Sequence, residues 1–273
     1  MKRVERKDGL FEHCLRPIWI VLYYCFLVLF ASLALVVNLI ALITALLPDA
    51  PWKARFFQAV IRGMVWFCLC LFRVTGIMRV ECEGFEALEK RPGESKPVLI
   101  ANHPCLMDVF LFYIHLPRLT CIYKSSLKKT LIQAEMGKEI GFISNANPRK
   151  MVEEGAAKVK AGRQLLIFPE ATRTETGYIN DFKLGAAAIA RMGGVSLQTV
   201  LIFTDSNVLS KEQSYFAVPQ LPIRMRLEVG QRFDPESYEK SQQLNRALED
   251  YFNEALRHGP RVFHGQNVEA SSK

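Results

Sequence analysis

The chain has 273 residues, half of them hydrophobic, and a formal net charge of +8. This length predicts one globular domain with an extension, and a basic, apolar chain suits an anionic membrane surface as readily as nucleic acid. The aromatic residues lie in apolar runs rather than among Lys and Arg, and no nucleic-acid motif is present, which excludes nucleic acid as a partner. The seven cysteines are odd in number and form no C-x-x-C pair, so we expect a reducing compartment without a zinc site or disulfide framework.

Two apolar runs lie near the start of the chain. The first, Ile18 to Leu47, contains no charged residue and exceeds the roughly 20 residues that cross a bilayer as a helix. The second, Phe56 to Phe72, contains Arg62 and is marginal as a span. A Pro-Asp-Ala-Pro turn separates the runs. A secretory signal would have a shorter apolar region, so residues 1–74 are predicted to be a permanent membrane-anchoring helix pair.

Basic residues flank both apolar runs, which predicts that both ends of the pair stay near the cytoplasm. The pair then either crosses and returns or dips into one leaflet as a hairpin, and a single crossing ranks third. Trp19, Tyr23 and Tyr24, near the start of the first run, suit an interfacial aromatic belt.

From Thr75 onward, short apolar strands alternate with amphipathic helices. This pattern predicts an α/β fold, a mixed, largely parallel sheet covered by helices, over residues 75–266, preceded by the membrane-associated pair and followed by a disordered tail at 267–273. The predicted strands are 77–80, 98–101, 121–123, 165–168, 197–203 and 225–229. The predicted helices are 104–116, 148–161, 183–192 and 240–257, and Asn147 with Pro148 suits the start of the second.

The segment Asn102-His103-Pro104-Cys105-Leu106-Met107-Asp108 follows the strand 98–101. Pro104 suits the first position of a helix, which makes His103 a cap residue and places Asp108 about one turn later. Asp108 could then reach back, fix the tautomer of His103 and raise its basicity, so that the ring accepts a proton from a hydroxyl. A lone His-x4-Asp pair is more often structural, and here its strand-to-helix context strengthens the functional interpretation.

A second polar segment, Phe168-Pro169-Glu170-Ala171-Thr172-Arg173, also follows a strand. Glu170 and Arg173 could bind a phosphate or a polyol, or form an ion pair that tightens the turn, and the residues alone leave both open. The short strand 121–123 would deliver Lys124 to the same edge of the sheet. Because no Gly-x-Ser-x-Gly elbow and no phosphate loop are present, a serine hydrolase or an NTPase is not favoured.

Together, the two segments resemble the first and third blocks of the glycerolipid acyltransferase family, over about residues 75–230. Its best-known bacterial members are 1-acylglycerol-3-phosphate acyltransferases. The resemblance implies that His103 deprotonates the acceptor hydroxyl and that Asp108 orients it. The substrate-binding residues that it implies are Asn102, Lys124, Arg149, Glu170, Thr172 and Arg173. It also implies acyl-ACP or acyl-CoA as co-substrate, neither a metal nor another cofactor, and a bacterial-type inner membrane with the site facing the cytoplasm.

Three departures from the family pattern concern acceptor recognition. Ala171 stands where the family usually has Gly, and Asn147 stands where an Arg is expected, with Arg149 two positions later. The two prolines usual in the fourth block are absent around residues 195–199. The segment 144–148 also looks like acyltransferases encoded with specialised lipid pathways.

The expected function is therefore acyl transfer to the free hydroxyl of a lysophospholipid, with membrane lipids as partners. The lead acceptor is 1-acyl-sn-glycerol-3-phosphate. The alternatives are another acceptor of the aryl-polyene or lyso-aminolipid type, a non-catalytic membrane lipid-binding protein, and a hydrolase that uses the same His-Asp pair. A helix beginning at Pro104 is expected to stabilise the oxyanion or an acceptor phosphate. Cys105 as a covalent nucleophile is a minor alternative.

Overall fold

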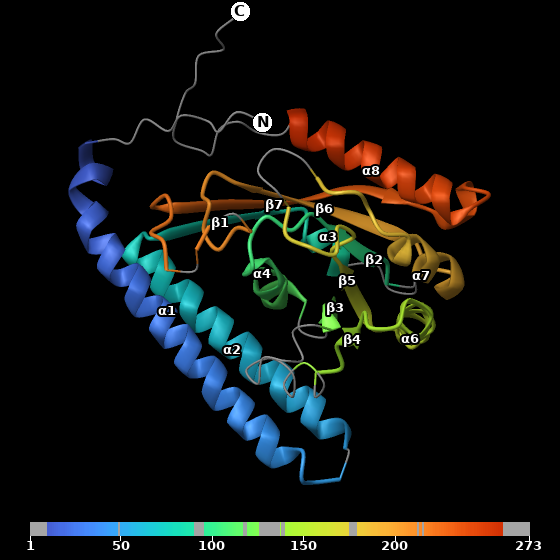
Figure 1. Ribbon diagram of the computed structural model, residues 1–273, viewed down its shortest axis with the longest axis horizontal. Helices are drawn as coiled ribbons and strands as arrows, with labels where there is room; N and C mark the ends of the chain where they lie inside the picture. The colour runs from blue at the N-terminus through green and yellow to red at the C-terminus, as the bar shows by residue number, and fades with distance from the viewer. Residues whose placement is uncertain are drawn as a thin grey trace, which may run out of the picture.

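A seven-stranded sheet forms the centre of the protein (Figure 1), with the strand order β1-β7-β6-β2-β5-β3-β4. The computed structural model describes residues 10–48, 50–89, 96–116, 119–125, 137, 140–174, 179–211, 213–214 and 216–258. The strands are β1 (Met78–Glu83), β2 (Val98–Ala101), β3 (Leu119–Tyr123), β4 (Ile143–Ser144), β5 (Gln164–Ile167), β6 (Leu197–Thr204) and β7 (Ile223–Phe233). All neighbours pair in parallel except β6 and β7, so the predicted mixed, largely parallel sheet is confirmed.

Both faces of the sheet are buried, as the continuous apolar sequences of its central strands require. In β2, Leu99 and Ala101 pack toward one core, and Val98 and Ile100 pack toward the other. The first core also contains α4 (Asp108–His115) and two N-terminal helices, α1 (Leu10–Thr44) and α2 (Pro51–Thr75). The second contains α6 (Pro148–Lys160), α7 (Gly185–Gly193) and α8 (Ser241–His258). The short α3 (Glu86–Glu89) and the 3₁₀ turn Pro235–Ser237 complete the described elements.

Local sequence signals explain where several helices begin and end. The Asn147 side chain accepts a hydrogen bond from the backbone N–H of Lys150 at 3.1 Å, and Pro148 follows as the first helical residue, which confirms the predicted start of α6. Gly76 adopts a left-handed conformation (φ 67°) directly after α2, a conformation that costs glycine little.

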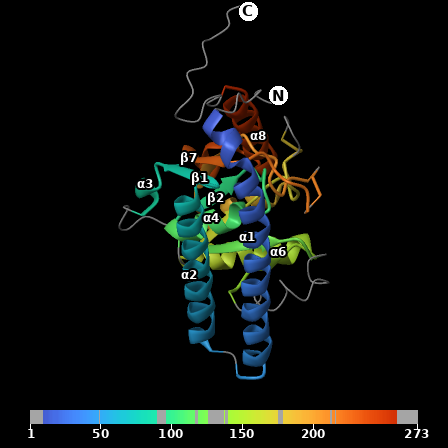
Figure 2. The ribbon, with the colours of Figure 1, turned by 90° about the vertical axis from the view of Figure 1, so that its left-hand side faces the viewer.

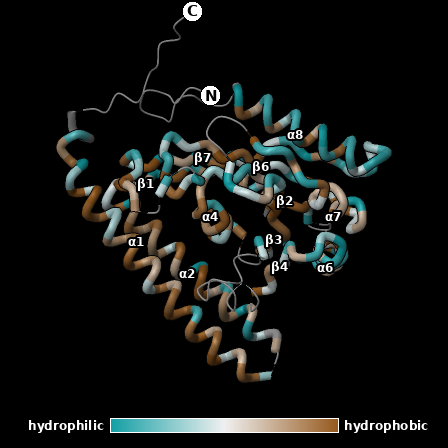
Figure 3. Tube along the Cα trace, viewed as in Figure 1, coloured by the Kyte–Doolittle hydropathy of each residue, from teal (hydrophilic) through white to brown (hydrophobic). Residues whose placement is uncertain are grey.

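The helices α1 and α2 lie side by side along one flank of the domain (Figures 1 and 2). Figure 3 shows their predominantly hydrophobic sequence, and both are long and apolar enough to cross a membrane by length and composition. Their outer surface exposes large apolar side chains, among them Ile18, Val21 and Val28 on α1 and Trp66 and Phe67 on α2. Large exposed apolar side chains on two such helices indicate association with a membrane.

The inner face of α2 packs on the domain along most of its length. Phe57, Ile61, Val65 and Cys68 are all buried, and the Gln58 side chain donates to the backbone carbonyl of Ile140 at 3.5 Å. From Gln58 to the end of α2 the helix extends over roughly 25 Å, at about 1.5 Å per residue. The domain therefore lies beside the hairpin rather than beyond one of its ends.

Two expectations about local structure are wrong. Residues 104–107 form a turn, and α4 begins only at Asp108, so Pro104 is not the first helical residue and His103 is not the cap. The carboxylate of Asp108 folds back onto this turn and binds the backbone N–H of Cys105. Trp19 and Tyr23 are buried instead of forming an interfacial belt, since the Trp19 indole donates to the carbonyl of Thr75.

The predicted boundaries 1–74 and 75–266 remain sequence-based predictions. The predicted disordered tail, 267–273, lies outside the described residues.

Candidate active site

The carboxyl ends of β2, β5 and β3 meet at one edge of the sheet because these strands are parallel neighbours. Beyond them the chain continues into Asn102 and His103, into Phe168 and Pro169, and into Lys124. The fold thus brings together three segments that are far apart in the sequence, those that follow β2, β3 and β5. In an open α/β sheet, ligands bind outside the carboxyl ends of the strands, where these segments lie.

His103 and Asp108 form a hydrogen-bonded pair at this edge. The distance from His103 Nδ1 to Asp108 Oδ2 is 3.0 Å, and the two side chains are 16% and 0% exposed. The His103 ring stacks on Phe168 with 4.2 Å between ring centroids, which holds the ring plane. When a carboxylate binds the proton on Nδ1, the second ring nitrogen keeps its lone pair as an acceptor. The pair therefore suits a general base.

Burial governs the titration of the two groups beside His103. It raises the pKa of Asp108, an effect that the hydrogen bond from His103 opposes. Burial, together with the nearby Asp108 carboxylate, holds the pKa of the Cys105 thiol well above its usual value. Because the thiolate is the nucleophilic form of cysteine, this environment disfavours Cys105 as a covalent nucleophile.

The backbone N–H groups of Cys105, Leu106, Met107 and Asp108, in the turn that leads into α4, are all bound to protein acceptors. Cys105 N–H donates to Asp108 Oδ2 at 2.8 Å, Met107 N–H to Cys105 Sγ at 3.4 Å, and Asp108 N–H to the Cys105 carbonyl at 3.2 Å. The Leu106 N–H donates to the carbonyl of Leu209 at 3.4 Å. The expectation that a helix beginning at Pro104 stabilises an oxyanion is therefore wrong, because that helix turn does not form.

Glu170 holds the loop that carries the second block. Its carboxylate is 2% exposed and accepts hydrogen bonds from the Asn180 backbone and side chain, at 2.9 and 2.7 Å, and from the Thr174 hydroxyl. It also accepts from the His103 backbone N–H at 3.3 Å. With both oxygens bound to protein donors, this geometry favours a positioning role over the implied direct contact with substrate.

Asn102 is likewise engaged with the protein. Its side-chain amide donates to the Ile202 carbonyl and accepts from the Ile202 N–H, both at 2.8 Å, and the side chain is 2% exposed. This two-point contact ties the end of β2 to β6. It fixes the backbone immediately before His103, and it does not favour the substrate contact that the resemblance implies.

Arg173 anchors the connection between β6 and β7 to the site. Its Nη1 donates to the carbonyls of Leu209 and Ser210, at 2.8 and 2.9 Å. The backbone of Leu209, whose carbonyl accepts one of these hydrogen bonds, has a left-handed conformation with φ 47°. Arg173 also lines the cavity beside His103.

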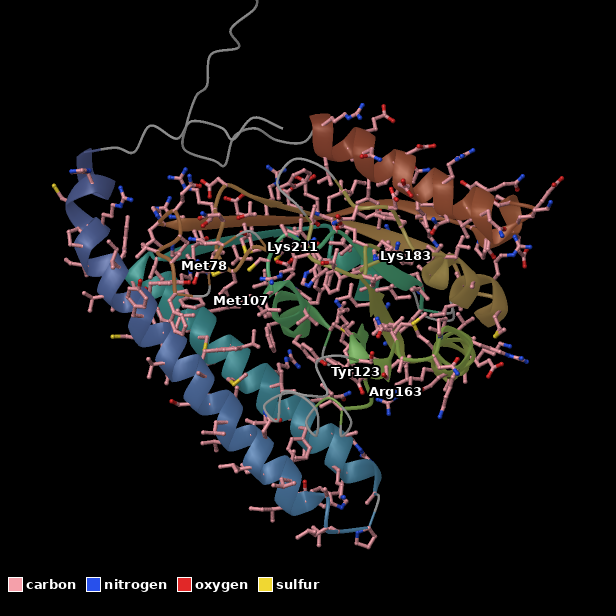
Figure 4. All side chains as sticks on the ribbon, viewed as in Figure 1. Met78, Met107, Tyr123, Arg163, Lys183 and Lys211 are labelled. Atoms are coloured by element: carbon pink, nitrogen blue, oxygen red, sulfur yellow. The ribbon has the colours of Figure 1, made fainter. Side chains whose placement is uncertain are left out.

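A cavity of about 1000 Å³ runs past His103. Its polar lining residues include Lys124, Thr172, Arg173 and Lys183, and much of the remaining lining is apolar and comes from α1, α2, α4, α6 and α7. Figure 4 shows Lys183 close to the start of α7 and Tyr123 at the end of β3. Such a cavity suits a molecule with a long apolar chain and an anionic group near its reacting atom.

Arg149 is not part of this cavity lining. It lies on the outer face of α6, 90% exposed, where it pairs with Glu153 at 3.0 Å. Of the residues singled out from the sequence, the structure thus brings His103, Asp108, Lys124, Thr172 and Arg173 together. Asn102 and Glu170 support the site from behind.

Sequence reasoning missed several supporting residues. Thr174 donates its backbone N–H to the His103 carbonyl at 2.7 Å, and Asn180 holds Glu170. Asn145 accepts from the Ser125 N–H at 2.8 Å and so holds the residue next to Lys124. Lys183, just before α7, also lines the cavity beside His103. No local pattern in the sequence analysis marks these four residues.

Within the part of the chain that the structure describes, no group of three or more His, Cys, Asp or Glu side chains is arranged to hold a metal ion. That the protein needs neither a metal nor another cofactor remains a prediction.

Comparison with known proteins gives a consistent result. Residues 79–203 match the model of a family described as Acyltransferase. Among curated proteins, the chain resembles 1-acyl-sn-glycerol-3-phosphate acyltransferases from Cocos nucifera, at 28% identity over 61% of this chain and 52% of the relative, and from Pseudomonas aeruginosa, at 26% identity over 54% and 58%. A third such relative, from Borreliella burgdorferi, is 27% identical over 45% of this chain and 52% of the relative. The matched region thus spans about half the length of these relatives.

Among solved structures, the chain resembles the crystal structure of the 1-acyl-sn-glycerophosphate acyltransferase from Thermotoga maritima. The TM-score is 0.59 at 20% identity, and the match covers 93% of this chain and 96% of that one. At this identity the likeness concerns the fold alone.

Proposed function

We propose that the chain is an O-acyltransferase that moves a fatty acyl group from a thioester donor to the hydroxyl of a membrane lysophospholipid, in keeping with the match of residues 79–203 to the Acyltransferase family model. The observation that carries the proposal is the His103–Asp108 pair, 3.0 Å apart, on the wall of a mostly apolar cavity. The curated relatives are named for this reaction on 1-acyl-sn-glycerol-3-phosphate, which makes that lipid the lead acceptor.

In the proposed mechanism His103 takes the proton of the acceptor hydroxyl on Nε2, while Asp108 holds the proton on Nδ1 and stabilises the imidazolium. The hydroxyl oxygen attacks the thioester carbonyl, and an oxygen–carbon bond forms. When the carbon–sulfur bond breaks, the thiolate leaves and takes the proton back from His103. The ester and a free thiol are the products, and His103 returns to its neutral state.

The positive charges of Lys124, Arg173 and Lys183 support a phosphate-bearing substrate, since all three line the cavity that contains His103. Thr172 adds a hydroxyl to the lining of the same cavity. Acyl-ACP and acyl-CoA both present their thioester on a phosphate-bearing arm, and both remain proposed donors. Neither metal nor cofactor enters the proposed reaction.

One observation favours a second candidate, acyl transfer to a different membrane lipid of the aryl-polyene or lyso-aminolipid type. Of the residues that the family resemblance assigns to the substrate, Arg149 lies on the outer face of α6, and Asn102 and Glu170 are bound to the protein. Recognition of the acceptor head group can therefore differ from that of the relatives while the chemistry stays the same.

We further propose that the helix hairpin lies in one leaflet, with the catalytic domain on the cytoplasmic face of a bacterial-type inner membrane. Support comes from the burial of α2 against the domain and from the exposure of Arg62 in the middle of that helix. A charged side chain in the middle of a helix that spans the bilayer is costly, because it lies in the hydrocarbon core. In a helix that lies in the interface, the same side chain reaches water.

The test is acyl transfer by purified wild-type protein and by His103→Ala, with labelled acyl-CoA or acyl-ACP and a panel of lysophospholipids. The matched control is His13→Ala, an exposed histidine at the start of α1. We expect loss of product in His103→Ala alone. Product with lysophosphatidate identifies the lead acceptor, and product with another lipid alone identifies the second candidate. Transfer at the wild-type rate by His103→Ala would contradict the mechanism.

A further inference from the structure

The connection between β6 and β7, residues 205–222, reaches from the active site to α1. At its inner end, Val208 and Leu209 line the cavity, and the carbonyl of Leu209 accepts hydrogen bonds from Arg173 and from the Leu106 N–H. The Asn207 side chain accepts from the Gln220 N–H at 3.1 Å, which closes the base of the connection. This end is therefore fixed to the catalytic segments.

The outer end of the same connection rests on the hairpin (Figure 1), where the orange trace between β6 and β7 approaches the N-terminal half of α1. The hydroxyl of Tyr24 donates to the backbone carbonyl of Phe216 at 2.8 Å. The Ala217 N–H donates to the Ser214 carbonyl at 3.0 Å, and the Phe216 N–H donates to the Ser214 hydroxyl at 3.4 Å, so both residues are held by hydrogen bonds to Ser214.

The side chain of Phe216 is 80% exposed. A single exposed aromatic residue is ordinary on a soluble protein. This one, however, lies beside Tyr24, whose neighbours one turn before and one turn after it on α1, Val21 and Val28, are also exposed. Residues spaced in this way share one helix face. Phe216 therefore extends the apolar outer surface of the hairpin onto the catalytic domain.

We propose that the turn around Phe216 inserts into the lipid–water interface beside α1 and gives the catalytic domain a membrane contact of its own. Large aromatic side chains are enriched at that interface, and burial of the Phe216 ring in it removes apolar surface from water. The inference rests on the membrane association of the hairpin but not on the acyltransferase activity. It also means that one continuous backbone segment joins a lipid contact at Phe216 to the Arg173 anchor beside His103.

The experiment places an environment-sensitive fluorescent amino acid at position 216 of the full chain and adds anionic phospholipid vesicles with brominated acyl chains. The matched control carries the same probe at Met192, a half-exposed position on α7, which packs on α6 and α8 away from the hairpin. Trp52 and Trp66, exposed on α2, report binding of the hairpin in the same sample. We expect a blue shift and quenching at 216 and an unchanged, water-like emission at 192.

Water-like emission at 216 while Trp52 and Trp66 are quenched would overturn the proposal and leave the hairpin anchor intact. Absence of quenching at all positions would overturn both. As a second measurement, Phe216→Ser is expected to weaken vesicle partitioning about tenfold, the effect of withdrawing much of one Phe side chain from lipid. Met192→Ser should leave partitioning unchanged, and an equal effect of both substitutions would contradict a specific contact at Phe216.

Discussion

The replacement Asp108→Asn separates the chemical role of the Asp108 carboxylate from its structural role. Oδ2 alone accepts both hydrogen bonds, from His103 Nδ1 at 3.0 Å and from the Cys105 N–H at 2.8 Å, and the carbonyl oxygen of an Asn can take its place. Oδ1 is buried without a hydrogen-bond partner among the described residues, so an amide nitrogen there breaks no observed contact. The substitution thus removes the negative charge and keeps the shape.

The expected loss is in kcat. Without the charge, the imidazolium that forms when His103 takes the acceptor proton is no longer stabilised by an adjacent carboxylate. General base catalysis contributes about 10²- to 10⁴-fold, and we expect a loss of kcat in this range with little change in KM for either substrate.

The expected effect on stability is small and pH-dependent. Because burial raises the pKa of Asp108 in the folded protein, its contribution to the free energy of unfolding is greatest below the ordinary pKa of the group and declines as pH rises toward the raised value. Asn does not ionise, so this decline disappears. At neutral pH, the free energy of unfolding of the variant should be no more than about 1 kcal/mol below that of the wild type.

The assay combines initial rates on a lysophospholipid panel with urea unfolding at several pH values, and Asp181→Asn, at an exposed position, is the control. A variant that keeps full kcat would refute the role of the carboxylate in base catalysis. A variant that loses several kcal/mol of stability would show that the charge serves the fold instead.

Three further predictions concern residues around this pair. Glu170→Gln places an amide NH₂ against the N–H and O–H groups that now donate to the carboxylate, and it is expected to lower the free energy of unfolding in urea by about 2–4 kcal/mol. We also expect a lower kcat, because the His103 backbone N–H loses a hydrogen-bond partner. Unchanged stability would contradict the positioning role. Asn102→Ala leaves the Ile202 N–H and carbonyl without their buried partner and should cost a similar 2–4 kcal/mol in the same assay. Lys124→Ala is expected to raise KM for a phosphate-bearing acceptor about tenfold, by loss of one charge-assisted contact, whereas the exposed Lys160→Ala leaves KM unchanged in steady-state kinetics.

Much of the architecture could be predicted from the sequence because its signals are local. The strand 98–101 matches β2, and the predicted strands near 165–168 and 197–203 match β5 and β6 within one residue at each end. Short apolar runs between polar turns are strongly biased toward buried strands, and Asn147 with Pro148 fixes a helix start through contacts within four residues. Even the His103–Asp108 contact spans only five positions.

The sequence by itself therefore determined the α/β sheet, the apolar hairpin and the presence of a His-Asp pair. The tertiary structure decided which polar residues face the cavity and which face the protein. Asn102 meets Ile202 across 100 positions, Glu170 meets the backbone of His103 across 67, and Arg173 meets Leu209 across 36. These partners depend on how strands and loops pack. Packing can leave a buried backbone donor or acceptor without a partner. A polar side chain next to it then binds that group, even where its residue type would also suit a ligand.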